Sequence, residues 1–381
     1  MRTLQEGDRG AIVDLLQWGL RRAGGSLQVD GVFGAATLRA LQRFQKARGL
    51  VPDGVAGPRT WSALRPWLTG LHSRTVVPTR LRWSVDLLEL VLQGLSARYS
   101  FLQINTIGVS PLGRAIWQVT IGQGSHRVGY NAAHHANEWI TTPVLLKFLE
   151  QYAAGVAHGG VLGGADCRTL YEKYTLDIVP MVNPDGVDLV TGALEETSDA
   201  YRSAREIASG FPDIPFPSGW KANIQGLDLN LAYPARWEEA KRLKYAQGFD
   251  RPAPRDFVGP APLAPPESRA MYDRAREADY RLILAYHTQG RVIYWKYDDR
   301  NPPGAYALVR RMEEASGYRA EITPAYSANA GYKDWFIQEY NRPGYTIEAG
   351  EGQSPLPLSQ FDEIYRDNLG ILLLGMVGLE E

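Results

Sequence analysis

One short segment decides how this chain folds: Val128-Gly129-Tyr130-Asn131-Ala132-Ala133-His134-His135-Ala136-Asn137-Glu138-Trp139-Ile140. Its first three residues are strand-like, and a helical apolar pattern over residues 141–154 follows it directly. The segment therefore predicts a connection from a strand to a helix, and this connection carries two histidines and a glutamate.

The same alternation of strands and helices continues on both sides of this segment. A helical pattern covers residues 83–99, and strand-like runs occur at residues 102–104, 115–121, 176–182, 282–286 and 344–347. This order predicts an α/β domain with a mixed, mostly parallel central sheet and helices on both faces. Asn183-Pro184-Asp185-Gly186 predicts a turn. Residues 188–219 and 237–266 show no regular pattern, and we expect long loops that rim a cleft.

Three side chains with metal-binding or acid–base chemistry lie where strands end. His287 and Glu348 directly follow buried strands, and Glu138 follows one closely. Ligands of such sheets bind at the carboxyl ends of the strands. His135 and Glu138 are three residues apart and can bind one ion if they share a turn, whereas the adjacent His134 lacks this spacing. Zinc suits these donors, and a catalytic zinc site needs three protein ligands and one open position.

Several further motifs occur in a fixed order along the chain. They are His135-Ala136-Asn137-Glu138-Trp139-Ile140, Asn183-Pro184-Asp185-Gly186, Gly226-Leu227-Asp228-Leu229-Asn230, His287 after Leu284-Ala285-Tyr286, Tyr326, Asp334-Trp335 and Tyr345-Thr346-Ile347-Glu348. Over roughly residues 83–376 this set resembles the zinc metallocarboxypeptidase family.

The resemblance implies a role for each matching residue. It implies one zinc ion (Zn2+) held by His135, Glu138 and His287, with Glu348 as the general base and later the acid. It also implies that Tyr326 donates a hydrogen bond to bound substrate and that Asp228 orients the ring of His135.

Four positions depart from the family pattern. The family's Asn-Arg pair, which holds a terminal carboxylate, is matched here by Asn230-Leu231, and leucine cannot bind a carboxylate. Asn137 and Lys221 stand where the family has two other arginines, the second of which stabilises the oxyanion. Lys333 matches the position that sets side-chain preference, where a lysine favours an acidic group; a solvated lysine is the alternative. These changes disfavour simple removal of C-terminal residues.

Two motifs that include the changed residues Lys221 and Lys333 resemble one branch of the family. Trp220-Lys221-Ala222-Asn223 and Gly331-Tyr332-Lys333-Asp334-Trp335-Phe336 resemble the γ-D-glutamyl-diaminopimelate peptidase branch. The resemblance implies hydrolysis of the γ-D-glutamyl bond to meso-diaminopimelate (or L-lysine) in bacterial cell-wall stem peptides. The alternatives are a broader zinc carboxypeptidase, a deacylase on the same scaffold and a catalytically inactive wall-binding protein.

The N-terminal residues contain an internal repeat. Asp30-Gly31-Val32-Phe33-Gly34 with Thr37 and Leu41 is matched by Asp53-Gly54-Val55-Ala56-Gly57 with Thr60 and Leu64. Each turn leads into an amphipathic helix, and an earlier helix spans residues 12–22. The pattern resembles a peptidoglycan-binding module; a generic three-helix bundle is the alternative. We expect a peptidoglycan-binding domain at 1–70, a linker at 71–80 and a zinc metallopeptidase domain at 81–381.

Composition limits the partners of the chain. The net charge of -1 gives no support for a nucleic-acid partner, since phosphate binding needs a concentrated basic face. No apolar run approaches the ~20 residues that a membrane helix needs, so we expect no membrane insertion. The first residues lack an apolar signal core. We therefore expect a cytoplasmic location, such as the mother cell or spore, or release to the wall, with peptidoglycan or muropeptides as partners.

Overall fold

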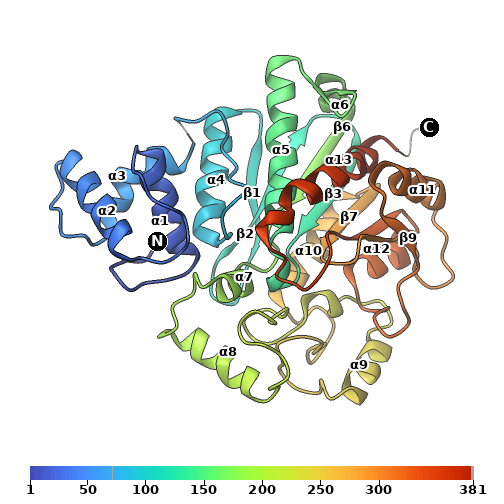
Figure 1. Cartoon of the computed structure of the whole chain (residues 1–381). Coiled ribbons are helices and arrows are strands. Elements are labelled where there is room, and N and C mark those ends of the chain that lie inside the picture. Colours follow the sequence, from blue (N-terminus) through green and yellow to red (C-terminus); the bar gives the residue numbers. More distant parts are fainter. Residues whose placement is uncertain (71, 379–381) are drawn as a thin grey trace.

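In the computed structural model of the chain, the described residues (1–70 and 72–378) form a small helical N-terminal part beside a larger α/β part (Figure 1). Residue 71 of the predicted linker and residues 379–381 of the predicted peptidase domain lie outside the described residues. Within the described part of the chain, no helix is long and apolar enough to cross a membrane.

The N-terminal part contains the three predicted helices, α1 (Ala11–Arg22), α2 (Ala35–Ala47) and α3 (Pro58–Leu68). Two buried glutamines explain the repeat. The carboxamide of Gln17 donates to the Asp30 carboxylate at 2.8 Å and to the Thr37 hydroxyl at 2.9 Å. Gln45 makes the equivalent bonds to Asp53 and Thr60, at 2.9 and 3.2 Å. Each Asp-Gly turn is thus tied to the preceding helix by one satisfied polar group.

The larger part is built on one mixed sheet with the strand order β1-β2-β6-β3-β7-β10-β8-β9. Its strands are β1 (Gln103–Val109), β2 (Ala115–Gly122), β3 (His126–Ala132), β6 (Tyr174–Val179), β7 (Leu282–His287), β8 (Val292–Tyr294), β9 (Arg319–Glu321) and β10 (Gly344–Glu348). The central strands β6, β3, β7 and β10 are parallel, whereas β1, β2 and β6 pair antiparallel. A separate hairpin joins β4 (Val161–Leu162) to β5 (Ala165–Asp166).

Helices cover both faces of this sheet, as the sequence predicts. They are α4 (Val85–Arg98), α5 (Thr141–His158), α6 (Cys167–Lys173), α7 (Pro184–Thr191), α8 (Asp199–Ser209), α9 (Trp237–Ala246), α10 (Pro266–Ala278), α11 (Ala305–Ser316), α12 (Tyr332–Tyr340) and α13 (Phe361–Val377), with short 3-10 turns η1 (Ala136–Glu138), η2 (Leu229–Leu231) and η3 (Leu358–Gln360).

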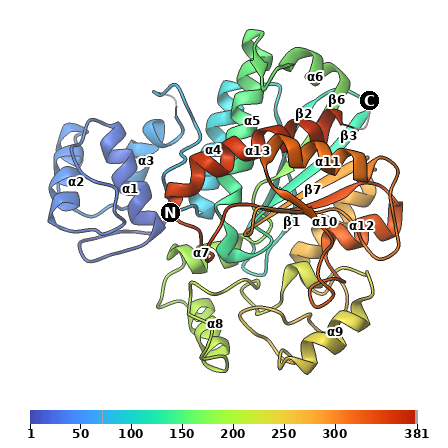
Figure 2. The ribbon, with the colours of Figure 1, turned by 45° about the vertical axis from the view of Figure 1, so that its right-hand side comes forward.

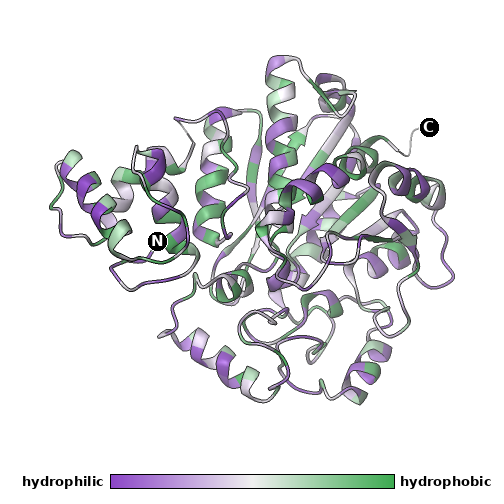
Figure 3. Cartoon of the chain, in the orientation of Figure 1, coloured by the Kyte–Doolittle hydropathy of each residue, from purple (hydrophilic) through white to green (hydrophobic). Residues whose placement is uncertain are grey.

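Strand β7 shows how the two cores form. Its residues Leu282, Leu284 and Tyr286 pack into the core that contains α5 and α13, and Ile283 and Ala285 pack into the core that contains α10 and α12. Alternate side chains of a strand point to opposite faces, so a continuous apolar run is what a doubly covered strand requires. Figure 3 shows this hydrophobic colour along the strands at the middle of the sheet.

Three local predictions are wrong. Residues 188–219 and 237–266 are not free of regular structure, because they contain α8 and α9, which lie at the same end of the molecule in both ribbon views (Figures 1 and 2). Each helix buries only a narrow stripe, such as Tyr201, Ala204 and Ala208 in α8. Asn183-Pro184-Asp185-Gly186 begins α7 rather than forming a free turn, since Asn183 caps the helix by accepting from the Gly186 amide at 3.1 Å.

The N-terminal part packs directly against the larger part. Gly10 approaches Gly192 so closely that a Cβ on Gly10 would lie 2.2 Å from the Gly192 carbonyl oxygen. Nearby, the Arg82 guanidinium donates to the carboxylate of buried Asp14 at 2.6 Å. The backbone contact requires glycine, both for space and because Gly10 has φ 109°.

We expect Gly10→Ala to destabilise this contact. Gly7→Ala is the matched control, because Gly7 also has positive φ (100°) but a Cβ there meets no atom within 4 Å. In thermal or denaturant unfolding, the free energy of unfolding of Gly10→Ala should be about 1–3 kcal/mol lower than that of Gly7→Ala, which is the usual cost of overpacking. Equal stability of the two variants would show that the two parts do not pack as described.

Candidate functional site

The carboxyl ends of three neighbouring parallel strands meet at one edge of the sheet. Strand β3 ends at Ala132 and leads to His135 and Glu138, whereas β7 and β10 end at His287 and Glu348. His287 and Glu348 are register partners in the parallel β7–β10 pair. Register partners in adjacent parallel strands point to the same face, so the fold places these two side chains beside each other.

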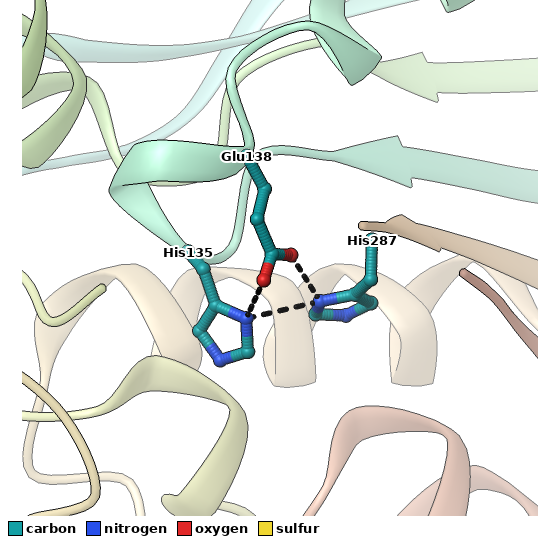
Figure 4. Close-up of side chains that lie close together, drawn as sticks. All are labelled: His135, Glu138 and His287. Atoms are coloured by element: carbon teal, nitrogen blue, oxygen red, sulfur yellow. Dashed lines mark hydrogen bonds and ion pairs between the residues drawn. The ribbon is translucent and has the colours of Figure 1, made fainter. Parts of the chain in front are cut away.

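The three predicted metal ligands come together (Figure 4). Nδ1 of His135 lies 3.0 Å from Oε1 of Glu138 and 3.2 Å from Nδ1 of His287. Nδ1 of His287 lies 2.9 Å from Oε2 of Glu138. The spacing predicted by the sequence is correct, because His135 rather than His134 shares the turn with Glu138.

This donor set fits a zinc ion. Two imidazole nitrogens and one carboxylate converge, which is the ligand number and type of a catalytic zinc site with one open position. The Nδ1 atoms of His135 and His287 face each other at 3.2 Å. Two such lone pairs at this distance are stabilised by a cation between them. The neighbouring His134 is directed elsewhere, with its Nε2 3.0 Å from the Tyr233 hydroxyl.

Asp228 holds the His135 ring, as predicted. Its Oδ1 lies 3.1 Å from Nε2 of His135, and its Oδ2 accepts from the Asp256 amide at 3.0 Å. A ring nitrogen bound to a carboxylate leaves the other nitrogen available as a ligand. Burial alone lowers the pKa of His135, but Glu138 and Asp228 outweigh it and raise the pKa to about 9. The surroundings of His135 therefore favour positive charge.

Lys221 contacts the same carboxylate. Its Nζ lies 2.9 Å from Oε1 of Glu138. Burial lowers the pKa of Lys221, but the Glu138 carboxylate outweighs burial and the net pKa is raised. Lys221 is therefore a fixed positive charge beside the metal ligands, where the sequence predicts an oxyanion-stabilising group.

These residues open into a pocket of about 170 Å3. It is lined by His135, Lys221, Asp228, Asn230, Leu231, Lys244, Arg255, Asp256, Tyr294, Thr323, Ser327, Gly331, Lys333, Asp334, Thr346 and Glu348. Burial, followed by the charge of Glu138, raises the pKa of Glu348 to about 8. A metal cation beside Glu348 lowers the pKa of this residue, because the positive charge stabilises the carboxylate form. Asn230 is also fixed, since its Oδ1 accepts from the Tyr332 amide at 3.0 Å.

Four predicted site residues are not among those that line the pocket: the metal ligands Glu138 and His287, and also Tyr326 and Asn137. Tyr326 is 66% exposed, and its role on bound substrate stays a prediction. Asn137 is buried, and its amide group contacts the Ser218 carbonyl at 3.4 Å. The structure therefore does not support Asn137 as a substrate-binding residue. The physical reason is that it precedes Glu138 in the 3-10 turn η1, where successive side chains diverge by about a third of a turn.

Lys333 lines the pocket, but its ammonium group is already engaged. Its Nζ lies 2.5 Å from Oδ1 of Asp334 and donates to the Lys296 carbonyl at 2.9 Å. The side chain is 4% exposed, so the alternative of a solvated lysine is wrong. Asp334 already neutralises its charge, and the predicted contact of Lys333 with an acidic substrate group stays a prediction.

Six residues that line the pocket are absent from the sequence prediction: Lys244, Arg255, Asp256, Tyr294, Thr323 and Ser327. The first three belong to residues 237–266, which were expected only to rim a cleft. A cluster of charges near Pro252 and Pro254 was the available signal, but no periodic pattern placed these residues at the pocket.

A buried acid supports the loop that carries Lys221 and Asp228. Asn223 contacts the Glu267 carboxyl group at 3.2 Å through Nδ2, and its Oδ1 accepts from the Gln225 and Leu227 amides at 3.1 Å. Burial raises the pKa of Glu267 to about 8. The loop is thus organised around one largely neutral carboxyl group at neutral pH.

Comparison with known proteins agrees with this geometry. Residues 88–370 match the zinc carboxypeptidase family, and residues 9–64 match the putative peptidoglycan binding domain. Gamma-D-glutamyl-L-diamino acid endopeptidase 1 of Lysinibacillus sphaericus is 45% identical over 287 residues, which cover 75% of this chain and 70% of that protein. The uncharacterized protein YqgT of Bacillus subtilis is 40% identical over 277 residues, which cover 72% of this chain and 72% of that protein.

A solved structure shows the same fold. The carboxypeptidase A of Helicoverpa armigera superposes with a TM-score of 0.59 at 19% identity, covering 92% of this chain and 88% of that chain. The predicted α/β fold with its mostly parallel sheet is confirmed.

Asp228→Asn should weaken zinc binding about 10- to 100-fold, because the amide no longer fixes the His135 ring as a carboxylate does. Competition with a chromogenic chelator measures this affinity. Asp250→Asn is the control, since Asp250 is exposed and pairs only with Arg251 among the described residues. An unchanged zinc affinity in Asp228→Asn would contradict the orienting role.

Glu267→Gln should change how stability depends on pH. The pKa of Glu267 is raised from 4.5 to about 8 on folding, so its stabilising contribution is present below pH 4.5 and is lost as the pH rises toward 8. The variant should therefore gain stability relative to the wild type between pH 5 and 8, by about 1 kcal/mol per pH unit. Denaturant unfolding across this range measures it, with exposed Glu277→Gln of the same helix as control. A difference that is constant with pH contradicts the buried-acid role.

Proposed function

Because the chain belongs to the zinc carboxypeptidase family and is a zinc metallopeptidase, we propose that it hydrolyses the γ-D-glutamyl bond to a diamino acid in bacterial cell-wall peptides. The diamino acid is meso-diaminopimelate or L-lysine. The observation that carries this proposal is Leu231, which lines the pocket beside Asn230 where the family has its carboxylate-binding arginine.

The altered pocket favours a substrate other than a free peptide C-terminus. Leu231 offers no donor to a terminal carboxylate, and Lys333 is held by Asp334. The relative from Lysinibacillus sphaericus is named for cleavage between γ-D-glutamate and an L-diamino acid. The peptidoglycan-binding domain at residues 9–64 is consistent with the same substrate, because it attaches the enzyme to the wall polymer.

The metal-binding residues and the side chain that orients one of them have separate tasks in this reaction. His135, Glu138 and His287 would hold the zinc ion, and Asp228 fixes the ring of His135. When bound, zinc activates water and polarises the scissile carbonyl.

Proton transfer and charge stabilisation fall to two other side chains. Glu348 lines the same pocket, and its carboxylate accepts the proton of the attacking water and then delivers it to the leaving amine. The ammonium of Lys221 lies within the same group of charges and stabilises negative charge that develops on the carbonyl oxygen.

Digestion of purified muropeptides followed by mass spectrometry tests this function. We expect a tripeptide and a tetrapeptide stem to yield the same L-alanyl-γ-D-glutamyl fragment, with diaminopimelate released from the first and diaminopimelyl-alanine from the second. Stepwise loss of C-terminal residues would instead show a broader carboxypeptidase.

Glu348→Gln should lower kcat about 100- to 10,000-fold, because the amide cannot transfer the proton. Its zinc content, measured by atomic emission spectroscopy, should equal that of the wild type, since Glu348 is not one of the three metal-binding residues. Full activity in this variant, or a wild type that binds no zinc, would contradict the assigned chemistry. The second result would instead favour a non-catalytic wall-binding protein.

A further inference from the structure

Four positively charged side chains other than histidine line the pocket, and three of them are already paired. Lys221 binds Glu138 at 2.9 Å, Lys244 binds Asp256 at 2.6 Å, and Lys333 binds Asp334 at 2.5 Å. All three lysine side chains are buried or nearly so. Each of these ammonium groups already faces a carboxylate that neutralises its charge, so none of them offers a substrate carboxylate an unpaired positive charge.

Arg255 differs from these lysines. Its Nε donates to Oδ2 of Asp256 at 2.6 Å, while both terminal nitrogens of the guanidinium lack a hydrogen-bond partner among residues 1–70 and 72–378. The side chain is 42% exposed and lines the pocket that contains His135 and Glu348. A guanidinium fixed through Nε presents its other donors as a fork that matches a carboxylate.

The local charge also favours an anion. Lys244 and Arg255 share the single carboxylate of Asp256, which leaves one positive charge without a partner at the pocket wall. Such a charge in a confined pocket attracts an acidic ligand more strongly than an equivalent charge in open solvent.

The position of Arg255 is fixed relative to the metal ligands. The Asp256 amide donates to Asp228 at 3.0 Å, and Asp228 contacts His135 at 3.1 Å. Asp256 has φ 66°, a conformation that is strained for a residue with a side chain and that its contacts must maintain. A short chain of contacts thus couples Arg255 to the group that holds the metal.

We propose that Arg255 binds a free carboxylate of the substrate and replaces, from a different loop, the arginine lost at Leu231. This inference rests on the proposed function and identifies the part of the wall peptide that the enzyme reads. A stem tripeptide that ends in meso-diaminopimelate offers three such carboxylates. They are the α-carboxylate of γ-linked D-glutamate and the two carboxylates of diaminopimelate.

The test compares this tripeptide with three analogues that each lack one carboxylate. In the first, D-glutamate is replaced by D-isoglutamine; in the second, L-lysine replaces diaminopimelate; in the third, the C-terminal carboxylate is amidated. We expect Arg255→Gln to lower kcat/KM on the parent peptide about 10- to 100-fold, the usual effect of losing a charged hydrogen bond. On the analogue that lacks the recognised carboxylate, the variant and the wild type should agree within about 2-fold, because the contact is already absent.

Two further variants make the comparison specific. Arg255→Lys should recover part of the loss, because it keeps the charge but not the fork. Arg251→Gln is the matched control from the same loop; Arg251 is 59% exposed, pairs with Asp250 and does not line the pocket. Its kinetics should equal those of the wild type on all four peptides. Zinc content and thermal stability of each variant exclude a folding defect.

An equal loss in Arg255→Gln on all four peptides, or no loss on the parent peptide, overturns the proposal. Failure of the proposed function has a different signature, because the wild type then does not cut the γ-D-glutamyl bond. In that case the wild type and Arg255→Gln are compared on a peptide that the enzyme does cut and on the forms of that peptide in which a carboxylate is amidated. This comparison tests Arg255 whether or not the proposed function is correct.

Discussion

The parallel pairing of β7 with β10 is the constraint on which the site depends. It places His287 opposite Glu348 at the ends of adjacent strands, while the neighbouring β3 leads into the turn that carries His135 and Glu138. A shift of one residue in either strand would point its terminal side chain to the opposite face, into the core rather than the pocket. Because both faces of β7 are buried and apolar, alternation alone does not oppose this shift; the different volumes of Tyr286 in one core and Ala285 in the other do. The packing of the sheet therefore determines the geometry of the chemistry.

The loops between the strands supply what the sheet cannot. Asp228 connects the metal site to the loop that carries Asp256 and Arg255. The contact of Asn223 with Glu267 supports the loop that carries Lys221 and Asp228. These contacts are mostly buried and charged, so each carboxylate is retained only where a partner offsets its desolvation. Substrate preference can consequently change through Arg255 or Leu231 while the metal ligands stay in place. The close contact of Gly10 with Gly192 extends this fixed arrangement to the N-terminal part.

Sequence patterns were sufficient for the strands, which rest on local rules, whereas the full set of metal ligands also required the resemblance to the family, because His287 is far from His135 and Glu138 in the chain. The apolar run of β7 and the three-residue spacing of His135 and Glu138 are readable without knowledge of distant contacts. The helices α8 and α9 were missed, since each buries only a few residues and is largely polar (Figure 3). The roles predicted for Lys333 and Asn137 rest on the family pattern, whereas their actual contacts, Asp334 and Ser218, depend on side-chain direction. The pairing of Gln17 with Asp30 and the place of Arg255 in the pocket are tertiary facts that no periodicity indicates.

The central claim is that one metal ion is held by two histidines and one glutamate from separate parts of the chain. A crystal structure of the zinc-loaded full chain, with anomalous data collected at the zinc absorption edge, tests it directly. The account predicts one anomalous peak bonded to His135, Glu138 and His287, with Nδ1 as the ligand atom of both rings. A zinc ion bound through His134, or found away from these three side chains, would contradict it.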